Sequence, residues 1–588
     1  MDSRRPPLAP AHRTLPEYVR HWAETTPDRR AFTFVDHPAP HSRGVHRTLT
    51  WQRLDLRVRA LAARLTEQAE PGARVALLCP QGTDYVTGFL AALAAGMVAV
   101  PLYPPGLPGH GDRLVGVMAD ARPAIVVTTS GALEEVADFC ERARVPVVAA
   151  DRVPDAAARD WQAPVPDPAA TAYLQYTSGS TRAPAGVEIT HANVVANARQ
   201  ALTAYGADAH PVTCVGWLPL YHDMGLVLSV AAPVVRGVPS VLMDPAAFLR
   251  EPARWLRLLA AHPRALSAAP NFAYDYCSSA VTEAQKAELR LDGVAVLING
   301  SEPVRPGTAD RFHAAFAAQG LAAEVHCPSY GLAEATVFVC AARPGEPLAR
   351  FALDRDALAT GKALPARPDD PRAVLLAGCG TPAGQRVRIV DPVSGAVLSE
   401  GEVGEIRVQG PNVGRGYWNN EPQTRRVFGS TLAEDAPGDC RGDSPGTWLR
   451  TGDLGTVLDG QLIVTGRLKD LIVVDGRNHY PQDVEATAQD AHAAVRRDRL
   501  AAFGVPGGAG ERVVVVAEHA RTTRLADIDV PALTRAVRAA VSARHGLRLA
   551  DVVLVAPGAV PRTSSGKVSR ALTRARYLEG AYAAGTAG

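Results

Sequence analysis

Short apolar runs rich in β-branched residues alternate with helical patterns along the first part of the chain. Residues 73–79 (ARVALLC), 124–129 and 145–151 are predicted as buried strands, because each run is short and is followed by a segment of helical periodicity. A second block with the same rhythm extends from about residue 174 to 339. This alternation predicts an α/β fold with two doubly wound, mostly parallel sheets in one large domain.

The pattern changes twice in the remaining chain. Residues 385–417 alternate over short stretches and are broken by Asp-Pro, Ser-Gly and Glu-Gly turns, which predicts antiparallel hairpins. Beyond residue 469 the run RVVVVAEH is followed by a helix with Leu533, Val537 and Val541 on one face. We therefore expect a large N-terminal domain at 1–468, with a β-rich subdomain at 378–465, and a small α+β domain at 469–588.

Composition and charge argue against a nucleic-acid-binding, membrane-spanning or secreted protein. At 588 residues the chain is too long for one core, and its 62 Lys and Arg against 60 Asp and Glu give no global reason to expect nucleic acid binding. The apolar stretch 89–102 is shorter than the roughly 20 residues of a membrane-spanning helix. The N-terminus lacks the apolar segment of a secretory signal and the eight cysteines contain no CxxC pair, so we expect a cytoplasmic protein without an integral membrane segment.

A run of small and hydroxylated residues, YTSGSTRAPAG at 176–186, is the first candidate for chemistry. Converging backbone N–H groups and hydroxyl side chains in such a loop can bind phosphate. The spacing differs from the Walker pattern GxxxxGK[ST], because Gly186 is followed by Val187, and this disfavours a nucleotidase of that class. Taken alone, the run fits an ordinary surface loop better than a phosphate site, so other segments must decide its role.

Further segments occur in a characteristic order after this loop. They are NGSEPV (299–304), PSYGLAEAT (328–336), WLRTGDLG (448–455), GRLKDLIVVDGRNHYPQDVE (466–485) and PRTSSGKVSR (561–570). With the glycine-rich loop they resemble the adenylate-forming superfamily across nearly the whole chain. The segments LQYTSGSTRAPAG, GWLPLYHDMGL and GRNHYPQDVE are similar to the fatty acyl-AMP ligase branch, which activates fatty acids with ATP and passes them to acyl carrier proteins.

The resemblance implies a set of nucleotide-binding residues. The loop would hold the leaving phosphates, Tyr330 would lie against adenine, Asp453 would bind the ribose hydroxyls, and Arg467 would add positive charge and assist catalysis. Glu334 would be the Mg²⁺ ligand, because Mg²⁺ prefers carboxylate oxygen. The full implied set for ATP is Thr177, Ser178, Gly179, Ser180, Thr181, Gly186, Gly300, Ser301, Glu302, Ser329, Tyr330, Gly331, Asp453 and Arg467.

The small domain carries two further implied roles. Lys567 matches the lysine that reaches across from this domain to bridge the carboxylate and the α-phosphate, and an exposed lysine without function is the alternative. Lys469 matches the hinge on which the small domain turns between adenylation and transfer. His222, Asp223, Met224 and Phe272 could line or gate the acyl tunnel, although the same residues would also fit an ordinary core.

Residues 340–377 are longer than a loop between strands requires. They resemble the insertion of fatty acyl-AMP ligases, which is thought to prevent productive use of coenzyme A. The resemblance therefore implies a fatty acid substrate and a separate acyl carrier protein with a phosphopantetheine arm. An acyl-coenzyme A synthetase, a catalytically silent acyl-adenylate-binding protein and an enzyme for amino or aryl acids remain as alternatives.

Overall fold

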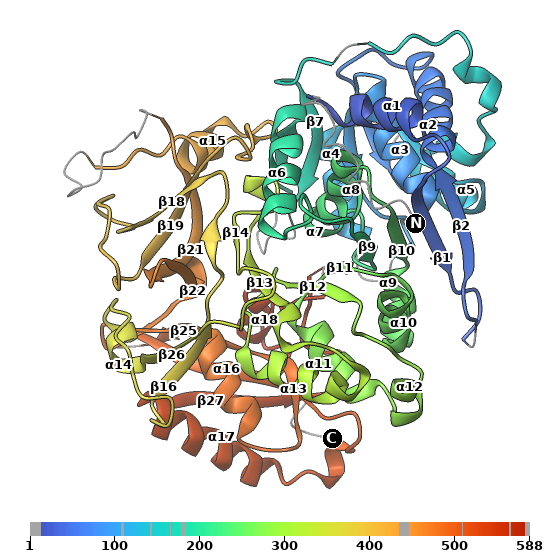
Figure 1. Cartoon of the computed structure of the whole chain (residues 1–588). Coiled ribbons are helices and arrows are strands. Elements are labelled where there is room, and N and C mark those ends of the chain that lie inside the picture. The colour runs from blue at the N-terminus through green and yellow to red at the C-terminus, as the bar shows by residue number, and fades with distance from the viewer. Residues whose placement is uncertain are drawn as a thin grey trace.

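The computed structural model describes residues 13–40, 42–106, 111–141, 144–164, 166–177, 184–433, 446–507, 510–563 and 566–582. Figure 1 shows a larger part formed by most of the chain, with the last elements of the chain gathered beneath it. No helix among these residues is long and apolar enough to cross a membrane. The α/β class predicted from the sequence is confirmed.

A seven-stranded sheet in the order β20-β8-β7-β4-β3-β5-β6 forms one half of the larger part. The central strands run parallel, and β8 and β20 are added antiparallel at one edge. All three runs predicted as buried strands are strands of this sheet. Its elements are α2 (Trp51–Thr66), β3 (Arg74–Leu77), α3 (Thr83–Ala94), β4 (Val98–Pro101), α4 (Gly111–Ala121), β5 (Ile125–Thr128), α5 (Leu133–Glu141), β6 (Val147–Ala149), β7 (Thr171–Tyr176), β8 (Gly186–Thr190) and β20 (Gly416–Tyr417).

A nine-stranded sheet in the order β17-β14-β13-β12-β11-β9-β10-β1-β2 forms the other half. Its strands are β1 (Arg30–Asp36), β2 (Val45–Thr50), β9 (Thr213–Gly216), β10 (Ser240–Met243), β11 (Ala265–Ala269), β12 (Val294–Asn299), β13 (His326–Tyr330), β14 (Cys340–Ala341) and β17 (Thr381–Pro382). The accompanying helices are α1 (Leu15–Thr25), α6 (His191–Ala204), α7 (Asp223–Leu226), α8 (Ala232–Arg236), α9 (Pro245–Arg250), α10 (Ala253–Ala261), α11 (Asn271–Ala280), α12 (Glu283–Ala287) and α13 (Pro306–Phe316).

The border predicted between the two sheets, near residue 174, is wrong. Strands β7 and β8 complete the first sheet, whereas β1 and β2 from the start of the chain join the second, with Phe32 opposite Ser240. The pairing of β1 with β10 connects segments far apart in sequence, and hydrophobic periodicity contains no information about such partners. One large core cluster consequently runs through both sheets.

A four-stranded antiparallel sheet follows, as the turn pattern predicts. It contains β18 (Arg386–Val390), β19 (Gly404–Gln409), β21 (Leu449–Leu458) and β22 (Gln461–Arg467), with α15 (Glu421–Phe428) beside it. The end of the predicted hairpin region differs, because β20 leaves this sheet to pair with β8. The segment 340–377 begins with β14, at the edge of the nine-stranded sheet, and continues as a hairpin of β15 (Arg350–Asp354) and β16 (Ala373–Ala377) with α14 (Arg355–Ala359) between them.

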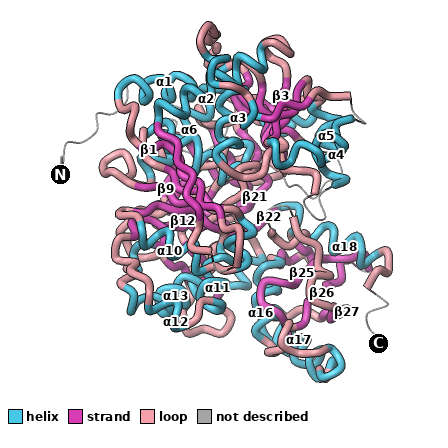
Figure 2. Tube along the Cα trace, turned by 90° about the vertical axis from the view of Figure 1, so that its right-hand side faces the viewer, coloured by secondary structure: helices cyan, strands magenta, loops and turns pink. Residues whose placement is uncertain are grey.

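The C-terminal elements have a hydrophobic core of their own. They are β23 (Ile472–Val474), β24 (Arg477–His479), α16 (Pro481–Asp490), β25 (Val495–Gly507), β26 (Gly510–His519), α17 (Val530–His545), β27 (Leu549–Val555) and α18 (Arg570–Leu578). Helix α17 buries Leu533, Val537 and Val541, and it ends where Gly546 adopts a left-handed conformation with φ of 64°. Figure 2 shows these elements grouped as a separate body beside β21 and β22. We call residues 469–582 the small part below.

Candidate active site

The candidate site lies where two neighbouring parallel strands of the nine-stranded sheet end. Strand β12 leads into Gly300, Ser301 and Glu302, and β13 ends at Ser329 and Tyr330. Carboxyl ends of adjacent parallel strands form the usual ligand crevice of α/β sheets. The two strand ends approach closely, because a Cβ atom on Gly300 would lie 2.8 Å from the carbonyl oxygen of Ser329. This position therefore requires glycine.

A cavity opens between these strand ends and α7. Of the residues predicted from the sequence, Asp223, Met224, Gly300, Ser301, Ser329, Tyr330 and Gly331 line it. The remaining lining is largely apolar and consists of Tyr205, Leu228, Ile298, Val337 and Phe338. Ser301 adopts a left-handed backbone with φ of 73°, a conformation that residues other than glycine rarely adopt outside functional sites. The cavity thus combines a polar wall with an apolar interior.

Asp453 joins the strand end of β13 to the four-stranded sheet. Its Oδ2 accepts a hydrogen bond of 2.8 Å from the Tyr330 hydroxyl, and its Oδ1 accepts one of 2.9 Å from Nε of Arg467. Asp453 is only 5% exposed. Each carboxylate oxygen retains a further lone pair, so the group can still accept hydrogen bonds from a vicinal diol. The structure therefore brings Tyr330, Asp453 and Arg467 together.

Glu334 lies on a short 3₁₀ turn after β13. Its Oε1 accepts a hydrogen bond of 2.7 Å from the hydroxyl of Tyr417, and the amide of Gly414 donates to its carbonyl. Burial raises the pKa of the Glu334 carboxyl, while Tyr417 and Arg467 act against this rise. Tyr417, in the segment GRGYW, was not anticipated from the sequence.

The glycine-rich loop is described only at its two ends. Ser178, Gly179, Ser180 and Thr181 lie outside the described residues, whereas Thr177 directly follows β7 and Gly186 begins β8. The amide of Thr177 donates to the carbonyl of Ala185, and Nη2 of Arg113 donates to the carbonyl of Thr177 at 2.6 Å. Arg113 on α4 was not anticipated from the sequence. Its guanidinium fixes the point at which the loop leaves the sheet.

The four tunnel candidates occupy three different places. Asp223 and Met224 line the cavity, and His222 lines a neighbouring small cavity together with Tyr103, Arg113 and Tyr221. Nδ1 of His222 lies 2.6 Å from Oδ1 of Asp223. Phe272 lines neither cavity; its backbone amide donates to Oε1 of Glu302 at 2.6 Å.

Lys567 is carried into the site by the loop before α18. This loop is closed by hydrogen bonds between Thr563 and Lys567 and between Gly566 and Thr563, and a Cβ atom on Gly566 would lie 3.9 Å from the ring of Phe272. Burial lowers the pKa of the Lys567 ammonium; Asp223, Glu302 and Asp453 favour its charged form and Arg467 opposes it. Lys567 therefore lies within the electrostatic reach of four groups of the larger part.

Lys469 is exposed on the 3₁₀ turn Leu468–Asp470 that joins β22 to the small part. The segment 340–377 contacts the small part nearby. Nε of Arg355 lies 2.7 Å from Oδ2 of Asp483, and Leu353 and Leu358 share a hydrophobic cluster with Tyr480. The inserted segment thus lies against both parts of the molecule.

The residues of the site fit ATP and Mg²⁺. Tyr330 offers a ring, Asp453 offers acceptors for a diol, and Glu334 offers a partly exposed carboxylate close to Arg467. No group of three His, Cys, Asp or Glu side chains suited to a metal occurs among the described residues. A single carboxylate accords with the way Mg²⁺ is held by one or two carboxylates together with substrate phosphates.

Comparisons with known proteins agree with this geometry. Residues 19–418 match the model of the AMP-binding enzyme family, and residues 469–586 match that of the Disco-interacting protein 2-like AMP domain. The chain is 41% identical to the long-chain-fatty-acid–AMP ligase FadD32 of Mycolicibacterium smegmatis, covering 97% of this chain and 95% of that protein. It is 40% identical to a 4-hydroxyphenylalkanoate adenylyltransferase of Mycobacterium tuberculosis, covering 97% and 93%.

Solved structures give the same result. A fatty acyl-adenylate ligase from a study of the E. coli and L. pneumophila enzymes superposes with a TM-score of 0.85 at 32% identity, covering 98% of each chain. The L. pneumophila ligase in complex with acyl adenylate and pyrophosphate gives a TM-score of 0.74 at 33% identity, covering 97% of each chain. The chain therefore belongs to the AMP-binding enzyme family, within its fatty acyl-AMP ligase branch.

Proposed function

We propose that the protein activates a fatty acid with ATP to give acyl-AMP and pyrophosphate. The acyl group then passes to the phosphopantetheine thiol of a separate acyl carrier protein in a polyketide, nonribosomal peptide or lipid pathway. The observation that supports this proposal is that Lys567, on the small part, lies within the electrostatic reach of Asp223, Glu302 and Asp453 on the larger part. We expect this reaction to take place in the cytoplasm, where ATP is available.

The chemistry assigns a role to each part of the site. A carboxylate oxygen of the fatty acid attacks the α-phosphorus of ATP, the bond to the bridging oxygen breaks, and pyrophosphate leaves. Lys567 neutralises the charge that gathers between the carboxylate and the α-phosphate. Tyr330 and Asp453 hold the nucleoside, the glycine-rich loop holds the leaving phosphates, and Glu334 would hold Mg²⁺, which offsets phosphate charge when it is bound. No base is needed, because the acid is already ionised.

The apolar interior of the cavity supports an acyl chain as the substrate tail. Met224, Leu228 and Ile298 offer apolar surface for such a chain, and the carboxylate of Asp223 in the same lining is already paired with His222 rather than left for the amine of an amino acid. One relative is named for a 4-hydroxyphenylalkanoate, so an aryl-alkanoic acid is the second candidate substrate. A silent binding protein is disfavoured, because Glu334, Asp453, Arg467 and Lys567 are all retained.

The inserted segment supports a carrier protein rather than coenzyme A as acceptor. Arg355 of α14 pairs with Asp483 of α16, and its Nη1 also donates to the carbonyl of Arg544. A segment held to the small part in this way limits how the small part can turn, and we infer that the permitted turn admits the phosphopantetheine arm of a carrier protein but not coenzyme A. An acyl-coenzyme A synthetase remains the alternative enzyme, and the accepted thiol distinguishes the two.

The proposal is tested by product analysis of the purified protein with ATP, Mg²⁺ and a panel of acids. The panel contains fatty acids of increasing length, 4-hydroxyphenylalkanoates and amino acids. Formation of acyl-AMP and pyrophosphate with fatty acids would support the proposal. A preference for the aryl acids would mean that the substrate is an aryl-alkanoic acid instead of a fatty acid. No adenylate with any acid would contradict the enzymatic function.

The low pKa of Lys567 predicts an alkaline limit of activity. Burial favours the neutral amine, so the folded protein loses this charge at a lower pH than an ordinary lysine does. The kcat/KM for adenylate formation, which reports on the free enzyme, should be maintained below this pKa and fall as the pH rises through it. In Lys567→Arg the fall should disappear from the accessible alkaline range; an unchanged pH profile would refute the assignment.

Lys469→Pro should separate the two half-reactions. Proline fixes φ near about −65° and removes the backbone donor, so a turn at this residue is restricted. If Lys469 is the hinge, acyl-AMP formation is expected to stay within about threefold of wild type, while transfer to a phosphopantetheine thiol falls about tenfold or more. Single-turnover assays of each step provide the measurement, and equal losses in both steps would argue against a hinge.

A further inference from the structure

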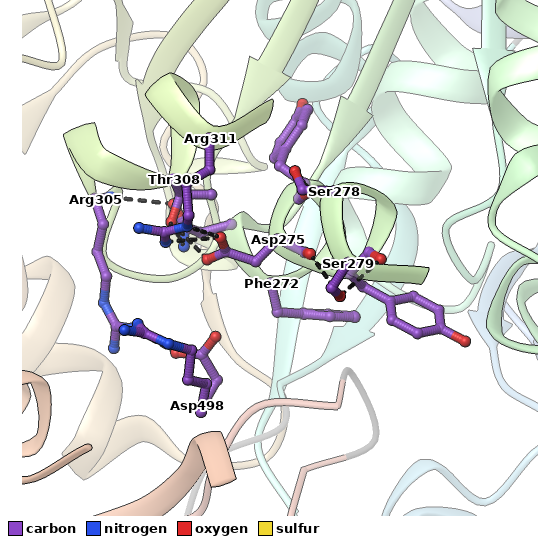
Figure 3. A network of polar contacts seen from close by, with 12 residues as sticks. Phe272, Asp275, Ser278, Ser279, Arg305, Thr308, Arg311 and Asp498 are labelled. Atoms are coloured by element: carbon purple, nitrogen blue, oxygen red, sulfur yellow. Dashed lines mark hydrogen bonds and ion pairs between the residues drawn. The ribbon is translucent and has the colours of Figure 1, made fainter. Parts of the chain in front are cut away.

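One ion pair joins the larger part to the small part beside the candidate site. Arg305 lies immediately before α13, and one of its guanidinium nitrogens is hydrogen-bonded to Oδ1 of Asp498 on β25. The two side chains are 28% and 21% exposed. Figure 3 shows Arg305 reaching from the larger part toward Asp498. The pair connects residues that are 193 positions apart in the sequence.

Arg305 is held firmly on its own side. Its backbone amide donates to Oδ1 of Asn271 at 3.1 Å, and Nδ2 of Asn271 donates to Oγ1 of Thr308 at 3.1 Å. Thr308 in turn donates to Asp275 at 2.6 Å, and Asp275 is paired with Arg311. This network fixes the start of α13 against α11, as Figure 3 shows.

Asp498 is equally constrained in the small part. It lies where the pairing of β25 with β26 shifts register, and it has a left-handed backbone with φ of 56°. Its amide donates to Oε1 of Gln489 on α16 at 3.1 Å. Aspartate tolerates this conformation, and the contact of its amide with Gln489 fixes the backbone from which its side chain extends.

Arg305 and Asp498 are each connected to a residue of the candidate site, Arg305 to Glu302 on the larger part and Asp498 to Lys567 on the small part. On the larger part, Arg305 closely follows Glu302, whose carboxylate accepts from the amide of Phe272. On the small part, Arg570 after the Lys567 loop donates to Oε1 of Glu485 at 2.7 Å, and the same oxygen accepts from the amide of Ala502 on β25 at 3.0 Å. Asp498 and Lys567 therefore belong to one rigid unit.

We propose that Arg305 and Asp498 are positioning residues that seat the small part, and with it Lys567, for acyl-adenylate formation. This inference rests on the proposed function. The inserted segment holds the small part through Arg355 and Asp483, and the pair of Arg305 with Asp498 adds a second ion pair, close to the candidate site. Two fixed points define the orientation of a rigid body far better than one, and small displacements of a catalytic group cost large factors in rate. The pair has to break when the small part turns for the thiol step.

The test uses Arg305→Gln, Asp498→Asn and the double variant in the full-length protein. Asparagine is chosen because it tolerates a left-handed backbone. Each single change should lower kcat for acyl-AMP formation about 10- to 100-fold, with the KM for ATP changed by less than about threefold. Transfer from purified acyl-AMP to pantetheine should be unchanged or faster. Because the two residues act as a pair, the double variant should be no worse than either single variant.

Arg350→Gln is the matched control. Arg350 pairs with Asp310 on the helix that Arg305 precedes, but both residues belong to the larger part and lie outside the network that holds Arg305. Its adenylation rate should remain close to wild type. Arg305→Lys keeps the charge and should recover most of the rate lost in Arg305→Gln, which identifies the ion pair rather than the side chain volume as the cause.

The outcomes distinguish a failure of the positioning role from a failure of the proposed function. Single variants with wild-type kcat, additive losses in the double variant, or equal losses in adenylation and transfer would overturn the positioning role. A wild-type protein that forms no acyl-AMP with any acid would overturn the proposed function and this inference with it. A folded Arg305→Lys protein with restored adenylation supports the role even if Arg305→Gln proves unstable.

Discussion

Lys567→Ala is expected to lower the rate of acyl-AMP formation by roughly 100- to 1,000-fold. The ammonium is a positive group of the small part within the electrostatic reach of Asp223, Glu302 and Asp453. Without it, the negative charge that develops between the carboxylate and the α-phosphate is no longer neutralised by the ammonium. Binding of ATP should change little, because Tyr330, Asp453 and the loop remain in place. Rapid-quench measurement of acyl-AMP and equilibrium binding of a nonhydrolysable ATP analogue test the two statements.

Lys362→Ala supplies the control for this experiment. Lys362 is exposed in the inserted segment and lies outside the candidate site, so its removal should leave adenylation unchanged. Wild-type adenylate formation by Lys567→Ala would show that Lys567 is an ordinary surface lysine and would refute its catalytic role.

Glu334→Gln is expected to reduce adenylation by about 100-fold or more at ordinary Mg²⁺ concentration. The amide keeps the shape of the side chain but lacks the negative charge that a divalent cation needs. Raising the Mg²⁺ concentration should restore part of the activity, because the remaining oxygen is a weaker ligand. The measurement is a titration of the initial rate with Mg²⁺ at fixed ATP.

Tyr417→Phe is the companion variant for Glu334. It keeps the ring but removes the hydrogen bond of 2.7 Å that favours the ionised carboxylate. Tyr417→Phe should lower the adenylation rate less than Glu334→Gln does. In both variants, raising the Mg²⁺ concentration should restore part of the rate. An unchanged Mg²⁺ dependence in Glu334→Gln would remove Glu334 from the metal site.

Much of the fold followed from local pattern. The helix with Leu533, Val537 and Val541 on its buried face and the strands at 73–79 and 124–129 are present as predicted, because periodicity and short apolar runs are local properties. The assignment of strands to sheets was wrong at β7, β8 and β20, and β1 and β2 were not predicted, since sheet membership depends on pairing between distant segments.

In the candidate site, too, single residues could be predicted from the sequence, whereas contacts between distant residues could not. Sequence motifs identify Tyr330, Glu334, Asp453 and Lys567 individually. These motifs do not indicate which other residues each side chain contacts. The hydrogen bond from Tyr417 to Glu334 spans 83 positions, and the pair of Arg305 with Asp498 spans 193. Such contacts exist only once the sheets and the small part are assembled.

From the sequence alone, the arginines of the C-terminal helix could form either a docking surface for an acidic carrier protein or a merely solvated face. In the structure Arg570 pairs with Glu485 and Asp470, and Arg574 donates to the carbonyl of Gly504. Arg496 is paired with Glu518. These side chains hold the small part together, so they offer less charge to a partner than the sequence suggested.

The central claim concerns both the activated acid and its acceptor. The most direct test gives the purified protein ATP, Mg²⁺ and a fatty acid together with equal concentrations of coenzyme A and a phosphopantetheinylated carrier protein. We predict that acyl-AMP forms, that acyl-coenzyme A does not accumulate, and that the acyl group appears on the carrier protein. Acyl-coenzyme A as the main product would contradict the proposed acceptor and would identify the protein as an acyl-coenzyme A synthetase.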